Sequence, residues 1–415
     1  MYTHEQVKLL SNLLCHAKEN IPYYFEILIN TDINESTAID ALRTIPIISK
    51  RDYRLNYKNL IDIQYDWKDI KNVFDISDKS FNRDHVYIVN GKKLIAEYTS
   101  GTTGAPFVTV KTEEERFSLG MSLWKLRKMH GNTDPQKMFL FMHTSLGAYP
   151  FPFAASNSFD QNLKELEYLS QSEHEWWHIF PSMLEGYAYW TRKKQIEFKN
   201  LVGIECNGAY ISDQERSSYE EIFQCKLVNN YGTRELWNIA YENINHTLTI
   251  NSDVLFELVD ENSQLIEENN KIGYVVVTSL RVRTMPFIRY YLGDMAYYSD
   301  YIGADGKKNR GITIVPGRHM ISGTDEYGNR FFREIAIDLI QSFNLKMIKS
   351  VFVKEISPGN FVVNFAGCNE NKGLAEEKFL ECLSLYKRVD SSNWKIQFTF
   401  DDIINNKSIF VSLVK

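Results

Sequence analysis

The spacing of apolar residues near the start of the chain predicts a helix. Thr3 and Gln6 are three positions apart, as in a capping box at a helix N-terminus. Proline cannot continue a helix, so we expect this one to end at Pro22. The residues between them include an apolar stripe at helical intervals: Val7, Leu10, Leu14 and Ala17.

A second helix is predicted to begin after Thr112. Thr112 and Glu115 repeat the capping spacing, and Gly131 is the expected C-terminal stop. Its predicted apolar face is formed by three residues: Phe117, Met121 and Trp124.

Shorter apolar runs predict that strands and helices alternate along the chain. We expect strands at 94–98, 138–142, 227–230 and 273–280, and a helix at 214–223. Residues 345–415 add strands at 348–353, 361–365 and 394–400 and a helix at 374–386. This order predicts an α/β fold. We expect a large N-terminal domain (1–318) with mixed β-sheets flanked by helices, and a small C-terminal α/β domain (319–415).

Composition narrows the class of protein. The 415 residues are 44% hydrophobic and 24% charged, an ordinary globular balance, and the net charge of −6 argues against a nucleic-acid partner. No apolar run approaches the ~20 residues that span a bilayer, and residues 1–20 lack the apolar core of a signal peptide. The five cysteines are scattered without a Cys-x-x-Cys pair, so we expect reduced thiols in a cytoplasmic protein. The oligomeric state is left open.

Residues 97–106 read Glu-Tyr-Thr-Ser-Gly-Thr-Thr-Gly-Ala-Pro, directly after a predicted strand. Glycines allow close backbone approach to a ligand, and hydroxyl groups with exposed N–H groups suit phosphate oxygens. Such a run alone is commonly a surface loop, and the Walker pattern with its lysine is absent. The order Thr-Ser-Gly-Thr-Thr-Gly-x-Pro resembles the phosphate loop of the adenylate-forming enzymes, which use ATP to activate carboxylic acids as acyl-AMP.

Further segments extend this resemblance in order along nearly the whole chain. Tyr-Gly-Thr-Arg-Glu at 231–235 looks like the superfamily's Tyr-Gly-x-x-Glu motif, and 273–280 followed by 285–294 is similar to its strand and Gly-Asp motif. Gly-Arg at 317–318 matches the pair before the domain hinge. Ile-Pro-Tyr-Tyr at 21–24 and Ile-Pro-Ile-Ile-Ser-Lys at 45–50 resemble the phenylacetate–coenzyme A ligase branch and its capsule-associated relatives.

The resemblance implies ATP-dependent activation of a small carboxylic acid, with an aromatic acid as one candidate. Pyrophosphate leaves, and the acyl group passes to the thiol of coenzyme A or of a carrier protein. Implied catalytic residues are Lys407, Glu235 and Thr102, with Glu235 holding Mg²⁺. The implied ATP- and AMP-binding residues are Thr99, Ser100, Gly101, Thr103, Gly104, Asn207, Gly208, Ala209, Tyr231, Gly232, Thr233, Asp294 and Arg318.

The expected roles differ among these residues. Tyr231 would stack on adenine, Asp294 would accept hydrogen bonds from the ribose hydroxyls, and Arg318 would contact the ribose or the α-phosphate. Lys407 would bridge the carboxylate and the α-phosphate, although any surface lysine near a C-terminus is a competing interpretation. The predicted acyl pocket has four candidate wall residues: Tyr149, Phe151, Asn207 and Tyr210. His143 is a candidate pocket residue next to the carboxylate, although a lone histidine is more often structural.

Several positions depart from the family pattern. Ala209 stands where relatives carry an adenine-side glutamate, and Ile321 stands where the hinge aspartate is expected. Asn243 and Thr249 occupy positions at which some relatives bind zinc through Cys or His, so we expect no zinc.

Three other functions remain open. One is an amide-forming ligase that passes the acyl group to an amine. The second is an inactive relative that binds nucleotide, which the departures motivate. The third and weakest is a kinase-like or hydrolytic ATPase, for which no kinase motif set occurs.

Overall fold

The computed structural model describes residues 2–74, 85–99, 107–132, 134–140, 159–208, 211, 213–260, 262–303, 306–315, 350–357, 360–366, 372–385 and 394–401. Contacts between residues divide the chain into two compact units. The first comprises Met1–Thr99 and Phe107–Ile314, and the second Ser100–Pro106 and Val315–Lys415. The predicted domain boundary at residue 318 lies outside the described residues.

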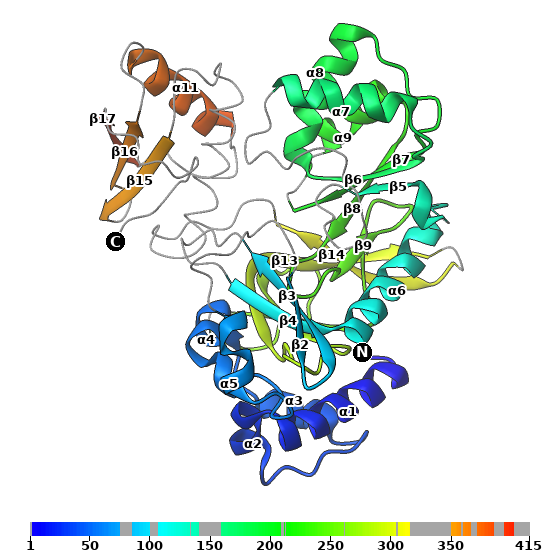
Figure 1. The fold of residues 1–415 in the computed structure, drawn as a ribbon, viewed down its shortest axis with the longest axis vertical. Coiled ribbons are helices and arrows are strands. Elements are labelled where there is room, and N and C mark those ends of the chain that lie inside the picture. Colours follow the sequence, from blue (N-terminus) through cyan, green and yellow to red (C-terminus); the bar gives the residue numbers. More distant parts are fainter. Residues whose placement is uncertain are drawn as a thin grey trace. The chain divides into compact units, whose positions relative to one another are not determined.

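The helices of the first unit (Figure 1) are α1 (His4–Asn20), α2 (Pro22–Leu28), α3 (Ala38–Thr44), α4 (Lys50–Asn56), α5 (Trp67–Ile70), α6 (Glu113–Met129), α7 (Phe159–Gln171), α8 (Pro181–Lys194) and α9 (Asp213–Phe223). Short 3₁₀ turns lie at Tyr57–Asn59, Lys71–Val73 and Pro135–Lys137. Its strands are β1 (Ile48–Ser49), β2 (His85–Val89), β3 (Lys92–Thr99), β4 (Phe107–Thr112), β5 (Met138–Leu140), β6 (Trp176–Ile179), β7 (Gly203–Asn207), β8 (Lys226–Tyr231), β9 (Ala240–Glu242), β10 (Leu248–Ile250), β11 (Val254–Val259), β12 (Gly273–Ser279), β13 (Tyr290–Ile302) and β14 (Lys308–Ile314).

Eleven described strands form one mixed sheet in the order β11-β12-β13-β14-β10-β9-β8-β7-β6-β5, with β1 added beside β13. The strands β5, β6, β7 and β8 run parallel, whereas the pairs from β8 to β11 are antiparallel. The predicted α/β fold with a mixed sheet flanked by helices is therefore confirmed.

Helices cover both faces of the parallel strands, as alternation of side chains along each strand requires. Trp177 and Ile179 of β6 pack in one core with residues of α7, α8 and α9, which gather beside β6 and β7 (Figure 1). Trp176, one position before Trp177, packs instead with Leu123 of α6. The parallel part of the sheet is thus the middle of three layers. The helices cover its two faces, so a site can form at the carboxyl ends of its strands.

The N-terminal helices pack on the antiparallel part of the sheet. The capping box of α1 forms as predicted, and four apolar residues of α1 enter the same core as β11 and β12: Leu10, Leu13, Leu14 and Ala17. The side-chain amide of Gln6 also donates to the carbonyl of Val254, at 3.2 Å. Pro22 does more than end α1, because it occupies the first turn of α2, where its missing N–H costs no hydrogen bond.

The apolar face predicted for α6 is buried only in part: Trp124 packs against the core that contains Leu123, but the other two residues do not. Phe117 and Met121 are 71% and 43% exposed, whereas Leu119, Leu123 and Arg127 are buried. The helix turns a partly polar face to the sheet because the sheet carries buried polar partners for it. Gly131 follows the helix end with a φ of +87°, as the predicted stop requires.

The β2–β3–β4 sheet is a smaller antiparallel element of the first unit. β2 and β3 are joined by a two-residue turn at Asn90 and Gly91, both with positive φ. β3 pairs with β4 from Thr99, opposite Phe107, to Leu94, opposite Thr112. The predicted phosphate loop begins at Thr99, the last residue of β3, and residues 100–106 connect the two strands in the sequence.

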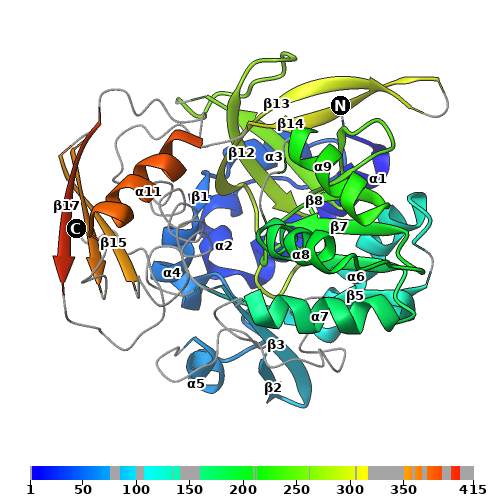
Figure 2. The same ribbon diagram turned by 90° about the horizontal axis from the view of Figure 1, so that it is seen from above.

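The second unit contains β15 (Ser350–Ser357), β16 (Asn360–Ala366), α11 (Lys372–Leu385) and β17 (Lys395–Asp401). β15 is antiparallel to β16, and β17 is parallel to it, so α11 is a crossover helix that lies along the strands (Figure 2). The ring of Phe379 on α11 packs against Phe365 and Phe398 of the sheet. These elements match those predicted from the sequence. Of the helices described in either unit, none is long and apolar enough to cross a membrane.

Candidate active site

Two of the predicted ligand-binding turns follow neighbouring parallel strands at the same edge of the sheet. β7 ends at Asn207 and β8 at Tyr231, and Asn207 pairs with Asn230 in the ladder. Gly208 has a φ of +91°, and a Cβ there would lie 3.0 Å from the ring of Phe180. Only glycine combines this backbone conformation with so close a neighbour. Ligands of α/β sheets commonly bind outside such carboxyl ends.

The segment after β8 is a tight turn that depends on Gly232. A Cβ at this position would lie 1.8 Å from the carbonyl oxygen of Trp237, which no side chain can occupy. The turn is closed by the N–H of Trp237, which donates to the carbonyl of Thr233 at 2.7 Å. The backbone therefore folds back on itself and fixes the position of Glu235 between the two ends of the turn.

The Glu235 carboxylate is buried, with only 3% of the residue exposed, yet it is paired. Lys50, the first residue of α4, places its Nζ 3.1 Å from Glu235 Oε1, and the hydroxyl of Tyr290 donates to the same oxygen at 3.3 Å. Burial by itself opposes ionisation, but the Lys50 charge and nearby hydrogen bonds hold the pKa of Glu235 below its usual value. Glu235 is thus an ionised carboxylate in a protected site.

The buried carboxylate of Glu235 has the chemistry of a magnesium ligand. Magnesium prefers oxygen ligands and commonly takes one carboxylate together with substrate phosphate oxygens. An ionised carboxylate held in place by a rigid turn fits that requirement. The Lys50 ammonium group contacts one of the two oxygens, so a cation at Oε1 would share it with Lys50 or displace it.

Tyr231 and Asp294 come from distant parts of the chain and meet directly. The Tyr231 hydroxyl donates to Asp294 Oδ2 at 3.0 Å, and both residues are partly exposed. Asp294 lies on β13, four residues after Tyr290. This strand therefore contributes Asp294 to the contact with Tyr231 and Tyr290 to the contact with Glu235. The structure therefore brings Tyr231 and Asp294 together and places Glu235 four residues after Tyr231, in the turn beyond β8.

The other predicted site residues lie outside the described residues, apart from Thr99, which is described only as the last residue of β3. Those outside are Ser100, Gly101, Thr102, Thr103, Gly104, His143, Tyr149, Phe151, Ala209, Tyr210, Arg318 and Lys407. Their roles stay predictions. The expected absence of zinc also stays a prediction: Asn243 Nδ2 donates to Thr249 Oγ1 at 3.2 Å, and the described residues hold no cluster of three or more His, Cys, Asp or Glu side chains suited to a metal.

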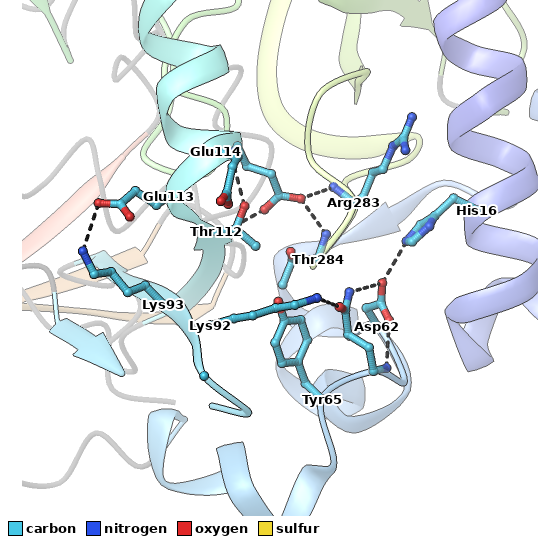
Figure 3. A pocket seen from close by; sticks show the side chains of 13 residues that line it. His16, Asp62, Tyr65, Lys92, Lys93, Thr112, Glu113, Glu114, Arg283 and Thr284 are labelled. Carbon is cyan, nitrogen blue, oxygen red and sulfur yellow. Dashed lines mark hydrogen bonds and ion pairs between the residues drawn. The ribbon is translucent and has the colours of Figure 1, made fainter. Parts of the chain in front are cut away.

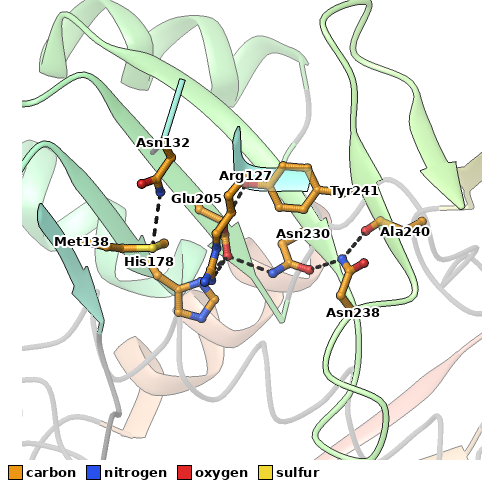
Figure 4. Close-up of polar contacts among 9 residues, drawn as sticks. All are labelled: Arg127, Asn132, Met138, His178, Glu205, Asn230, Asn238, Ala240 and Tyr241. Carbon is orange, nitrogen blue, oxygen red and sulfur yellow. Dashed lines mark hydrogen bonds and ion pairs between the residues drawn. The ribbon is translucent and has the colours of Figure 1, made fainter. Parts of the chain in front are cut away.

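Behind the candidate site, a buried polar network links β7 to its neighbours (Figure 4). Glu205 of β7 accepts two hydrogen bonds from Arg127 of α6, Nε at 2.7 Å and Nη2 at 2.8 Å. It also accepts from His178 Nδ1 and Tyr241 Oη, both at 2.7 Å, and from Asn230 Nδ2 at 2.9 Å. Burial opposes ionisation here, but Arg127 and His178 hold the pKa of Glu205 well below its usual value.

Sequence reasoning missed Lys50, Glu97, Lys111 and Trp237 as partners of the site. Glu97 and Lys111 carry charges in strands that are otherwise apolar, and such residues are rarely buried unless paired. A charged residue within an apolar strand was therefore the feature of the sequence that could have indicated a buried ion pair. Lys50 gave none, because its contact with Glu235 joins positions 185 residues apart.

A cavity of about 530 Å³ elsewhere in the first unit contains none of the predicted site residues (Figure 3). His16 Nε2 and Asp62 Oδ2 are 3.0 Å apart on its wall. Glu115 accepts from the backbone N–H groups of Arg283 and Thr284, at 2.6 and 2.8 Å. The polar groups that line the cavity are thus largely engaged with one another.

Comparison with known proteins finds solved structures with a similar fold. No family model matches the chain, and no curated protein sequence matches it. Among solved structures, 2-hydroxyisobutyryl-CoA ligase is similar in its postadenylation state with R3-HIB-AMP, at 14% identity and a TM-score of 0.61, over 99% of this chain and 89% of that one. The same ligase with 2-HIB-AMP gives 13% identity and a TM-score of 0.59 over the same shares.

A third structure of that ligase, with 2-HIB-AMP and CoA in the thioesterification state, matches at 14% identity and a TM-score of 0.59, over 98% of this chain and 89% of that one. At these identities the likeness concerns the fold. The chain therefore shares the overall α/β fold of this ligase.

Proposed function

We propose that this protein is an ATP- and Mg²⁺-dependent acid–thiol ligase of the AMP-forming kind, similar to phenylacetate–coenzyme A ligases. The observation that carries the proposal is the hydrogen bond between Tyr231 and Asp294, together with the buried, paired carboxylate of Glu235 four residues beyond Tyr231 in the turn after β8. The Thr-Ser-Gly-Thr-Thr-Gly run begins at Thr99, the last residue of β3. Thr99 belongs to the same unit as Tyr231, Glu235 and Asp294.

In the proposed first half-reaction, a carboxylate oxygen of the acid attacks the α-phosphorus of ATP. The bond from that phosphorus to the bridging oxygen breaks, and pyrophosphate leaves. Glu235 would hold Mg²⁺, which neutralises charge on the phosphate oxygens when bound. Asp294, oriented by the Tyr231 hydroxyl, would accept from the ribose hydroxyls, because an ionised carboxylate only accepts hydrogen bonds. Positioning of this kind supplies most of the catalysis in phosphoryl chemistry.

In the proposed second half-reaction, a thiol sulfur attacks the acyl carbon of the adenylate. The bond from that carbon to the AMP oxygen breaks, and the thiol proton is released. Coenzyme A, a carrier-protein phosphopantetheine and an amine are the three candidate acceptors, and a small, flat aryl acid is the candidate substrate. We further propose that the protein acts in the cytoplasm, given its scattered cysteines.

The test is ATP–pyrophosphate exchange with Mg²⁺ against aryl, aliphatic and amino acids. Exchange stimulated by one class supports the proposal and identifies the acyl substrate, after which the acceptors are compared by product analysis. Formation of ADP and phosphate in place of AMP and pyrophosphate contradicts it.

The alternative is a nucleotide-binding relative without adenylation activity. The observation that favours it is the Lys50–Glu235 ion pair, which engages the proposed metal ligand. This alternative predicts that ATP binds in calorimetry equally well with and without Mg²⁺, while no acid in the panel stimulates exchange. The ligase predicts that Mg²⁺ strengthens ATP binding.

A further inference from the structure

One buried carboxylate joins three elements around the candidate site. Glu97 lies on β3, is 1% exposed, and precedes the predicted phosphate loop by two residues. Its oxygens contact Lys111 Nζ of β4 at 2.7 Å, Arg116 Nε of α6 at 3.2 Å and the indole N–H of Trp237 at 3.1 Å. The carboxylate therefore ties both strands of the β3–β4 pair and a helix to the turn that carries Glu235.

Lys111 provides a second connection to the same turn. Its ammonium group is fully buried and donates to Glu97 Oε2, to Thr109 Oγ1 at 3.0 Å and to the carbonyl of Arg234 at 3.4 Å. Arg234 immediately precedes Glu235. Because an ammonium group has three donors, these contacts use its whole capacity.

The two connections lie on either side of Glu235. Lys111 holds the backbone at Arg234, and Glu97 holds the side chain of Trp237, two residues beyond Glu235. The guanidinium of Arg116 also stacks over the Trp237 ring at 5.2 Å. Gly232 lets this turn close. The segment that carries Glu235 is therefore held at three positions: Gly232, Arg234 and Trp237.

Positive charges around Glu97 keep its carboxyl group ionised at neutral pH. Burial opposes ionisation of Glu97, but Lys111, Arg234 and Arg116 hold the pKa of its carboxyl group below the usual value. Apolar residues of similar size would often be as stable in such a place, so stability alone is a weak reason for a buried ion cluster. Fixing the relative position of two segments is a better reason.

We propose that Glu97, Lys111 and Trp237 are positioning residues that hold the Glu235 turn against the β3–β4 pair. This inference rests on the proposed function, because it assigns the rigidity of the turn to metal binding by Glu235. Partners that orient a metal ligand typically change metal affinity by about 10- to 100-fold when they are removed.

The decisive variant is Trp237→Phe, which keeps an aromatic ring and removes the indole N–H that Glu97 accepts. The matched control is Trp177→Phe, because Trp177 is also packed against the large sheet, is 1% exposed, and its indole nitrogen has no hydrogen-bond partner among the described residues. The readout is the Kd of Mn²⁺, measured by electron paramagnetic resonance in the presence of a non-hydrolysable ATP analogue. Melting temperature is recorded for each variant.

We expect Trp237→Phe to weaken Mn²⁺ binding by roughly tenfold and Trp177→Phe to leave it unchanged, although both lower the melting temperature. Wild-type Mn²⁺ affinity in Trp237→Phe, or equal weakening in the two variants, overturns the positioning role. If Trp237→Phe does not fold, Glu97→Gln gives the same comparison, because it removes the charge while preserving the shape. If the wild-type protein binds no Mn²⁺ with the analogue, the proposed metal role of Glu235 itself fails, and this inference fails with it.

Discussion

Replacing Glu205 by glutamine tests whether the buried network of Figure 4 stabilises the first unit. The glutamine side chain keeps one acceptor oxygen and places an NH₂ donor where the other oxygen was. If the NH₂ group replaces Oε2, Arg127 Nε and the Tyr241 hydroxyl lose their acceptor; if it replaces Oε1, three donors do. In both cases the Arg127 guanidinium stays buried without a counter-charge.

Breaking a buried ion pair from one side costs about 3–5 kcal/mol. The first unit has about 300 residues, and unfolding entropy is roughly 2.1 cal/mol/K per residue. The melting temperature of Glu205→Gln should therefore fall by roughly 5–8 °C. Differential scanning calorimetry at pH 7 measures this shift directly.

The control for this prediction is Glu175→Gln, which breaks the partly exposed ion pair between Glu175 and Lys137. Pairs of that kind contribute about 0–1 kcal/mol, so the control should shift the melting temperature by less than ~2 °C. A shift of that small size in Glu205→Gln would refute the view that the network carries a large share of the stability of this unit.

Three further predictions concern the site and its response to pH. Gly232→Ala should abolish exchange activity and lower the melting temperature, because its Cβ would lie 1.8 Å from the Trp237 carbonyl oxygen; an active, stable variant would contradict the geometry of the turn. Glu235→Gln should lower the exchange rate by roughly two orders of magnitude without unfolding the protein. If the dependence of the exchange rate on Mg²⁺ concentration is the same as in the wild type, Glu235 is not the metal ligand. In melting curves across pH, stability should begin to fall below about pH 6.5, because burial lowers the pKa of His130, so the unfolded chain takes up a proton that the fold resists. A second fall should follow below about pH 4.5, because the fold lowers the pKa values of three carboxyl groups: Glu97, Glu205 and Glu235. The stability that they contribute is present above their pKa in the unfolded chain and is lost as the pH falls through their pKa in the folded protein. His130→Gln should reduce the first fall without removing it, because burial also lowers the pKa of His174, and it should leave the second fall unchanged.

The sequence predicts those features of the fold that depend on local patterns. The capping boxes at Thr3 and Thr112 are present as predicted, because a cap involves residues only three positions apart. Strands such as β8 and β12 are likewise recognisable from their apolar runs. The alternation of these elements was sufficient to predict a mixed α/β fold.

The buried face of α6 could not be read from the helix alone. Which side of the helix is buried depends on Glu205 and Asn251, acceptors for Arg127 and Ser122 that lie 78 and 129 residues away. Local hydrophobicity therefore favoured Phe117 and Met121. The same limit applies to Lys50, whose role as partner of Glu235 depends on tertiary contact and has no local signature.

The contact between α1 and β11 bears on how this protein can be handled. β11 ends the strand order of the large sheet, all six of its residues are buried, and Gln6 at the start of α1 binds the carbonyl of its first residue, Val254. An apolar strand at a sheet edge is a template for pairing with other chains when it is uncovered. Removing the N-terminal helix would uncover part of the core that it shares with this strand. Shortened expression variants that lack the helix should therefore accumulate as insoluble protein, even if the proposed site residues are intact.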